Sequence, residues 1–131
     1  MMRVLVVDDS KMMRLMHARS LRQAGYQVEV LEAGDGAEGL RALDSAGTVD
    51  LIICDWNMPG MDGLEFVRAV RSRQREKNLP RIPILMVTSQ GTQEQLARAR
   101  EAGVDTLLVK PVTAEALAVS LEMLLKTSAR G

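Results

Sequence analysis

Three acidic side chains in this sequence directly follow short runs of apolar residues. Asp8 and Asp9 come after the run at 3–7 (RVLVV), and Asp55 comes after the run at 50–54 (DLIIC). If the two runs are neighbouring parallel strands, the three carboxylates meet at one edge of a sheet, where like charges raise one another's pKa values. A cation relieves this repulsion, and oxygen ligands of this kind suit Mg²⁺, which also retains waters and a substrate phosphate. The sequence therefore predicts a Mg²⁺ site.

Two more polar side chains follow apolar runs in the same way. Thr88 comes after 82–87 (IPILMV), and Lys110 comes after 106–109 (TLLV). A hydroxyl donor and an ammonium group beside a metal-bound carboxylate make a site for a transferred phosphoryl group. A cis peptide bond between Lys110 and Pro111 would aim the lysine into this site. Each residue alone is explained as a helix cap or a surface charge, but five of them at the ends of four strands are not.

These side chains need a scaffold that brings four strand ends to one edge. Five apolar runs alternate with segments of ten or more residues that contain good helix formers and helix start signals. Regular alternation of this kind predicts right-handed crossovers and a doubly wound (βα)5 α/β fold, in which helices cover both faces of a parallel five-stranded sheet. The five runs are 3–7, 27–33, 50–54, 82–87 and 106–109.

The strand order follows from the character of the runs. The second run, 27–33, alternates polar and apolar residues as an edge strand does, whereas the first, third and fourth are almost wholly apolar. The order 2-1-3-4-5 satisfies this pattern and places the switch point between strands one and three, where such sheets bind ligands. Helix starts are marked by pairs with capping-box spacing, and two glycines mark helix ends. These are Asp35/Glu38, Asp62/Glu65 and Thr92/Gln95, with Gly25 and Gly103.

Composition narrows the functional classes. The 17 basic and 17 acidic residues cancel, so charge gives no reason to expect a nucleic-acid or membrane partner. The single cysteine, Cys54, lies within an apolar run and indicates a core residue of a cytoplasmic protein. No apolar stretch approaches the ~18 residues of a membrane span.

Four stretches together resemble the receiver domain of bacterial response regulators: VLVVDDS, DWNMPGMDGLEF, ILMVTS and LLVKP. The similarity runs from about Arg3 to Lys126, and the stretch around Asp55 is particularly similar to the single-domain, CheY-like members. It implies one receiver domain over 1–131, with a core of about 3–126. It also implies a two-component switch, in which a sensor histidine kinase or a histidine phosphotransfer protein donates a phosphoryl group to Asp55. Phosphorylation would then alter the face around helix four, strand five and helix five to control a downstream effector.

The resemblance also implies a role for each site residue. Asp9 would ligate Mg²⁺ directly, Asp8 mainly through water, and Asn57 through its backbone carbonyl. Thr88 would bond a phosphoryl oxygen and draw its loop inward, while Lys110 would pair with another oxygen. The site would catalyse its own phosphorylation and slow hydrolysis without being a conventional enzyme.

The sequence departs from the receiver pattern at two positions. Many receivers carry Tyr or Phe three residues before the lysine, and here that position is Leu107. Readout should then depend on displacement of the fourth helix, in which only Leu96 is a large apolar anchor. Val112 replaces an aromatic residue that is common after the Lys-Pro pair, and both changes weigh against binding to a flagellar motor.

Three other residues carry expectations that the structure can check or refine. Trp56 is expected at the mouth of the site, and His17 is expected as a partly exposed residue of the first helix, not a metal ligand. Gln90, with Asn57, is hypothesised to tune hydrolysis by crowding the attacking water.

Two other functional classes remain open from the sequence. A phosphorylation-independent interaction module would not use the acidic site. A Mg²⁺-dependent phosphohydrolase would use Asp55 as its nucleophile, but such enzymes generally need another acid two residues on, where Asn57 stands. A monomer is expected, with dimerisation left open. The sequence identifies neither the kinase nor the target, and it does not distinguish chemotaxis from another phosphorelay, or an independent protein from a receiver excised from a longer regulator.

Overall fold

Strands and helices alternate along the whole chain in the computed structural model, which describes residues 1–130, with side chains through Lys126. The ten elements are β1 (Met2–Val7), α1 (Lys11–Gln23), β2 (Val28–Ala33), α2 (Gly36–Ala46), β3 (Leu51–Asp55), α3 (Gly63–Glu76), β4 (Ile84–Thr88), α4 (Gln93–Ala102), β5 (Thr106–Val109) and α5 (Ala114–Arg130). None of the described helices combines the length and the apolar content that a membrane span requires.

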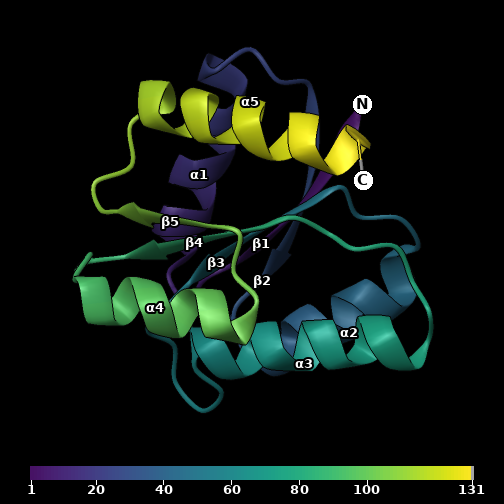
Figure 1. The fold of residues 1–131 in the computed structure, drawn as a ribbon. Coiled ribbons are helices and arrows are strands. Elements are labelled where there is room, and N and C mark those ends of the chain that lie inside the picture. Colours follow the sequence, from purple (N-terminus) through teal and green to yellow (C-terminus); the bar gives the residue numbers. More distant parts are fainter. Residues whose placement is uncertain (131) are drawn as a thin grey trace.

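The five strands form one parallel sheet in the order β2-β1-β3-β4-β5. Helices α1 and α5 cover one face of this sheet, and α2, α3 and α4 cover the other (Figure 1). The predicted fold class and strand order are confirmed, including the place of the alternating strand β2 at an edge. The carboxyl ends of β1 and β3 lie side by side, which is the arrangement that the acidic site requires.

The core has two halves because successive residues of a strand point to opposite faces of the sheet. On the α1/α5 face, Val6 and Ile53 pack with Leu21, while on the other face Cys54 packs with Phe66. Cys54 is fully buried and makes the core contact predicted for it. Strands β3 and β4 are buried along their entire length, so the site at their ends is carried by a rigid part of the molecule.

Side-chain caps fix where the helices begin after the loops that carry the site. The predicted caps of α2, α3 and α4 are confirmed, since Asp35, Asp62 and Thr92 each accept a hydrogen bond from the backbone N–H three residues on. Ser10 caps α1 by accepting from the Met13 N–H. At the other end of α4, Gly103 adopts a left-handed conformation with a φ of 110°, which glycine reaches without strain.

Gly63 lets α3 approach the end of β3 closely. Its N–H donates to the Trp56 carbonyl oxygen at 2.8 Å. A Cβ at this position would lie 2.5 Å from the Asp55 carbonyl oxygen and 2.8 Å from Trp56 Cα, both backbone atoms that cannot swing aside. The N-terminus of α3 therefore packs directly against the backbone of Asp55 and Trp56.

Replacing Gly63 by alanine should destabilise the protein by about 1–3 kcal/mol, because the added methyl group forces the α3 N-terminus away from β3. Urea unfolding measures this free energy. Gly34→Ala is the matched control, since its Cβ would make only ordinary contacts, the nearest 3.5 Å from Glu38 Oε2. We expect this control to change stability by less than about 0.5 kcal/mol. Equal effects of the two substitutions would contradict the close approach.

Candidate functional site

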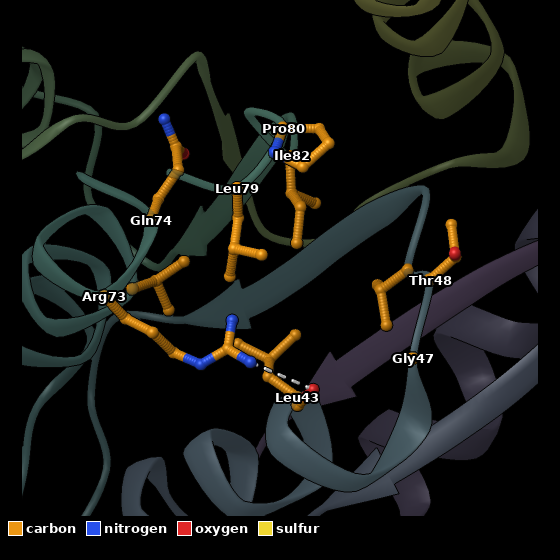
Figure 2. A pocket seen from close by; sticks show the side chains of 10 residues that line it. Leu43, Gly47, Thr48, Arg73, Gln74, Leu79, Pro80 and Ile82 are labelled. Carbon is orange, nitrogen blue, oxygen red and sulfur yellow. Dashed lines mark hydrogen bonds between the residues drawn. The ribbon is translucent and has the colours of Figure 1, made fainter. Parts of the chain in front are cut away.

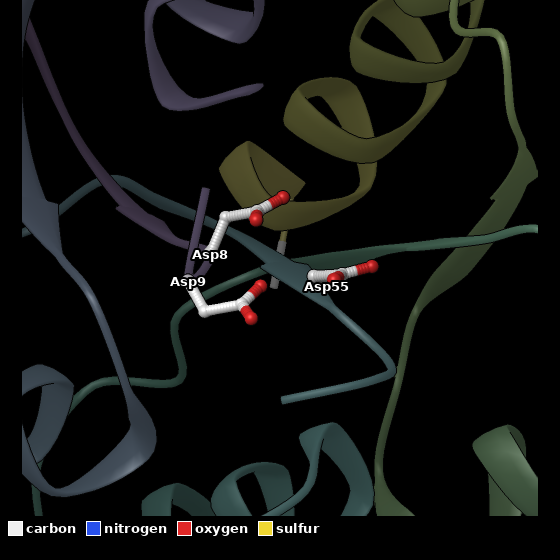
Figure 3. Close-up of side chains that lie close together, drawn as sticks. All are labelled: Asp8, Asp9 and Asp55. Carbon is white, nitrogen blue, oxygen red and sulfur yellow. The ribbon is translucent and has the colours of Figure 1, made fainter. Parts of the chain in front are cut away.

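Three carboxylates converge at the carboxyl ends of β1 and β3. Val7 pairs with Cys54 in the parallel register, so Asp8 and Asp55 are the next residues along two adjacent strands. Each of Asp8, Asp9 and Asp55 offers one oxygen, and these oxygens all lie within 4.8 Å of one another. Figure 3 shows the three side chains gathered at the carboxyl ends of the two strands. The cluster predicted from the sequence is therefore present.

The cluster carries an electrostatic cost because two of its members are buried. Asp8 is 1% exposed and Asp55 is 5% exposed. Burial raises the pKa of Asp8, and the charges of Asp55 and Asp9 raise it further, against the opposing effects of the Ser10 N–H and Lys110. Within the described part of the chain, Asp8 Oδ2 is buried and accepts no hydrogen bond. An unsatisfied carboxylate oxygen beside two other carboxylates fits the donor set of a hard divalent cation.

Lys110 and Thr88 complete the group from the neighbouring strand ends. Lys110 Nζ lies 3.0 Å from Asp55 Oδ1, and its backbone N–H donates to the Thr88 carbonyl oxygen at 2.7 Å. The peptide bond to Pro111 is cis, as the sequence suggested. Thr88 is buried, and its hydroxyl oxygen accepts a hydrogen bond from the Gln90 N–H at 3.3 Å. The structure thus brings the amine predicted for phosphoryl chemistry into direct contact with the predicted acceptor.

The mouth of the site is a shallow hollow lined by Asp9, Asn57, Met58, Pro59 and Asp62. The position predicted for Asn57 at the metal site is compatible with this, since it shares the hollow with Asp9. Trp56 was expected here as well, but it does not line the hollow. It is 6% exposed and packs into the core on the α2–α4 face of the sheet.

A cation on α4 covers the Trp56 ring. The Arg98 guanidinium carbon lies 5.7 Å from the ring centroid, within the range of a cation–π contact. The sequence alone did not predict the contact between Arg98 and Trp56, because this contact depends on how α4 is rotated about its axis. Trp56, the residue next to Asp55, therefore contacts α4 directly.

His17 corrects another expectation, since it is 4% exposed and not partly exposed as predicted. It lies on the inward stripe of α1 with Leu21, four residues on, so it faces the sheet although it is polar. Its Nε2 is 3.9 Å from Asp8 Oδ2, and burial lowers its pKa.

A separate cavity of 210 Å³ lies at the opposite end of the sheet, before β3 and β4 (Figure 2). Its lining combines apolar side chains such as Leu43, Leu79 and Ile82 with the polar side chains of Thr48, Arg73 and Gln74. The Arg73 guanidinium beside it already donates to the Leu43 carbonyl oxygen and to Asp44. This cavity contains none of the site residues, so it does not contribute to the acidic cluster.

Comparisons with known proteins agree on one family. The profile of the response regulator receiver domain matches residues 4–122. The chemotaxis protein CheY1 of Helicobacter pylori is 42% identical over 127 residues, covering 97% of this chain and 99% of that protein. The chemotaxis protein CheY of Pseudomonas aeruginosa is 42% identical over 121 residues, covering 92% and 94%. The solved structure of Vibrio cholerae CheY4 at low pH superimposes with a TM-score of 0.81 at 41% identity, covering 95% of this chain and 99% of that one.

Asp8→Asn should stabilise the metal-free protein at neutral pH by on the order of 1 kcal/mol, because it removes a buried charge from a crowded cluster. The folded pKa of Asp8 is raised, so as the pH falls through that value the folded state binds a proton before the unfolded state does. Wild-type stability from this group therefore rises on acidification, and the advantage of the variant should shrink towards about pH 4. Urea unfolding in chelator at the two pH values measures both effects.

Asp44→Asn provides the control for this experiment. Asp44 is exposed and ion-paired with Arg73 and Lys77, which lower its pKa. Removing its charge should therefore give no stabilisation at neutral pH. A loss of stability in metal-free Asp8→Asn would contradict the charge crowding inferred for the cluster.

Proposed function

The chain belongs to the response regulator receiver domain family, and on this basis we propose that it is a phosphorylation-dependent switch of a two-component system with Asp55 as the phosphoryl acceptor. CheY-like receivers are signalling proteins that interact with histidine kinases and downstream effectors, and they are not classical enzymes. The observation that carries the proposal is the 3.0 Å ion pair between Lys110 and Asp55 inside the carboxylate cluster.

The proposed cofactor is Mg²⁺. Receiver domains typically bind a divalent metal, and the acidic cluster fits one. Asp9 would ligate the ion directly and Asp8 mainly through water, while Asp55 and the Asn57 backbone carbonyl complete the protein ligands. When bound, the cation supplies positive charge for the carboxylates and for the oxygens of the incoming phosphoryl group.

The proposed reaction transfers a phosphoryl group from a phosphohistidine to an Asp55 carboxylate oxygen. The O–P bond forms as the N–P bond breaks, and the histidine nitrogen leaves with the bonding electron pair. Lys110 exchanges its carboxylate partner for a phosphoryl oxygen, so its charge is already in place when the phosphoryl group arrives. Thr88 has its own O–H to donate to another oxygen, because the Gln90 N–H uses only a lone pair of its hydroxyl. Slow hydrolysis would follow, tuned by Asn57 and Gln90.

The proposed partners are a sensor histidine kinase or a histidine phosphotransfer protein and one downstream effector. The chain would act as a single receiver domain over 1–131, with a core of about 3–126, and as a monomer in the cytoplasm. The buried, unpaired thiol of Cys54 is typical of that compartment.

Helix α4 would communicate the phosphorylation of Asp55 to the effector. The C-terminal end of this helix is held in place by Arg71. Arg71 is buried, and its guanidinium donates twice to the Gly103 carbonyl oxygen at the end of α4, at 3.0 and 2.9 Å. It also donates to the Ile82 carbonyl oxygen and pairs with Asp105. Burial lowers the pKa of Arg71 to about 10, which leaves it charged at neutral pH. The C-terminal end of α4 is therefore tied to α3 and to the sheet.

The N-terminal half of α4 is held more loosely. The buried residues of this helix are Ala99 and Ala102, both in its second half, and Leu96 is only half-buried. Arg98 over Trp56 is a contact from this helix to the residue after the acceptor. We therefore expect α4 to pivot about its Arg71 end, in place of the aromatic rotation that Leu107 cannot provide. Leu107 itself lines a hollow between α4 and β5, where an effector would sense this movement.

Incubating the protein with acetyl phosphate and Mg²⁺ should add one phosphoryl group to Asp55, detectable by intact-mass and peptide mass spectrometry. Asp55→Asn should lose this modification, because the amide is a poor nucleophile. Lys110→Ala should retain a folded structure and be modified at least about tenfold more slowly, since one fixed charge is lost. An unmodified wild type would favour the phosphorylation-independent module, and steady release of phosphate from added phosphomonoesters would favour the phosphohydrolase.

Arg98→Ala should loosen the part of α4 that precedes its buried residues, because it removes the contact between Arg98 and Trp56, which is worth about 0.5–1 kcal/mol. Amide hydrogen exchange in residues 93–98 should accelerate, while exchange near Gly103, which Arg71 holds, stays unchanged. Arg100→Ala, which removes another exposed arginine from the same helix, should leave the exchange pattern of residues 93–98 as in wild type. Unchanged exchange in Arg98→Ala would exclude the contact as a restraint on α4.

A further inference from the structure

Arg14 joins the metal site to a strand that carries no site residue. One turn into α1, its Nη1 donates to the Asp8 carbonyl oxygen at 2.7 Å, and its Nε donates to Glu32 Oε1 at 2.8 Å. Glu32 lies on the edge strand β2 and is 43% exposed, whereas the Arg14 side chain is only 16% exposed. The guanidinium therefore spans from β2 to the end of β1.

The bond to Asp8 holds the peptide that links the two proposed metal carboxylates. Because a peptide unit is planar, fixing its carbonyl oxygen also fixes the positions of the two flanking Cα atoms, from which the two carboxylate side chains extend. Asp8 has further restraints, since its N–H donates to the Ala33 carbonyl oxygen and its Oδ1 accepts from the Ser10 N–H. The Asp9 carboxylate is exposed and accepts no hydrogen bond from the described residues. The place from which it extends therefore depends on the peptide that Arg14 holds.

We propose that Arg14 is a positioning residue for the metal site, with Glu32 as its anchor: the pair orients the Asp8–Asp9 peptide before the cation binds. This inference rests on the proposed function, since it concerns the same cation. Glu32 serves a second purpose, because its carboxylate balances the guanidinium charge that would otherwise face an incoming cation. Among the described residues, Arg14 bonds to Asp8 and Glu32 and not to Asp55, so it is assigned no role in the transfer itself.

Positioning and electrostatics predict opposite results when Arg14 is removed. If its charge were all that mattered, Arg14→Ala would strengthen Mg²⁺ binding, because a nearby positive charge disappears. If it positions the peptide, the same substitution weakens Mg²⁺ binding. Removing a group that orients metal ligands typically lowers metal affinity by about 10–100-fold. The direction of the change in affinity thus distinguishes the two roles.

The experiment measures the Mg²⁺ dissociation constant of the full chain by isothermal titration calorimetry. Circular dichroism in the same buffer, without denaturant, first verifies that each variant is folded. We expect Arg14→Ala to raise the constant about tenfold or more, and Glu32→Gln to raise it by a smaller factor. Glu29→Gln is the matched control. Glu29 lies on the same strand, is 52% exposed and pairs with Arg3 at 3.3 Å, so this variant loses a comparable ion pair that does not reach the site. Its dissociation constant should equal that of wild type.

An unchanged or lower Mg²⁺ dissociation constant in folded Arg14→Ala would overturn the positioning role of Arg14. The proposed function would still stand in that case, provided that the wild-type protein binds Mg²⁺. If Arg14→Ala does not fold, Arg14→Lys decides, because it keeps the positive charge but loses the forked contact to Asp8 and Glu32. Positioning then predicts a higher dissociation constant, whereas charge alone predicts no change. If wild type itself binds no Mg²⁺, the proposed function fails and the inference falls with it. Equal weakening in Glu29→Gln would also overturn the inference, since the effect would then belong to the loss of any ion pair on β2.

Discussion

Repulsion among three carboxylates at one edge of the sheet is the constraint on which the rest of this structure depends. Asp8 and Asp55 are held 1% and 5% exposed by strands that cannot move apart, so their charges are not dispersed by water. Positive charge relieves this repulsion. Among the described residues, Lys110 supplies such a charge in contact with Asp55. The unsatisfied oxygen of Asp8 calls for another. A divalent cation would relieve this repulsion and, under the proposed function, would also neutralise the negative charge of the phosphoryl oxygens.

The surroundings of the cluster act on it through backbone atoms more than through side chains. Gly63 lets α3 close against the Asp55 backbone, and Arg14 holds the Asp8 carbonyl oxygen. Trp56 follows Asp55 directly and lies under Arg98 of α4. Arg71 donates to the Gly103 carbonyl oxygen at the C-terminal end of α4, so under the proposed function a change beside Asp55 would reach this helix at Arg98, next to its less buried N-terminal half. A rigid site beside a less anchored helix segment is the combination that a switch requires.

The sequence predicted the fold and the cluster because both follow from where strands end. Apolar runs broken by Asp8, Asp55, Thr88 and Lys110 fix the strand ends, and parallel topology brings these residues together whatever the details of helix packing. Contacts that depend on the rotation of a helix about its axis were not predictable. His17 faces the sheet although it is polar, and the Arg98–Trp56 and Arg14–Asp8 contacts join helices to loops through long side chains. Such side chains have many rotamers, and only the packed structure selects one.

Under the proposed function, a divalent cation makes the buried carboxylate of Asp55 able to hold a phosphoryl group. The most direct test of this claim is the binding of beryllofluoride, a phosphoryl mimic, followed by Trp56 fluorescence over a range of Mg²⁺ concentrations. The claim predicts saturable beryllofluoride binding that tightens with Mg²⁺, disappears in chelator and is absent in Asp55→Ala. Beryllofluoride binding of equal affinity with and without Mg²⁺, or Mg²⁺ binding that leaves the protein unable to bind beryllofluoride, would contradict it.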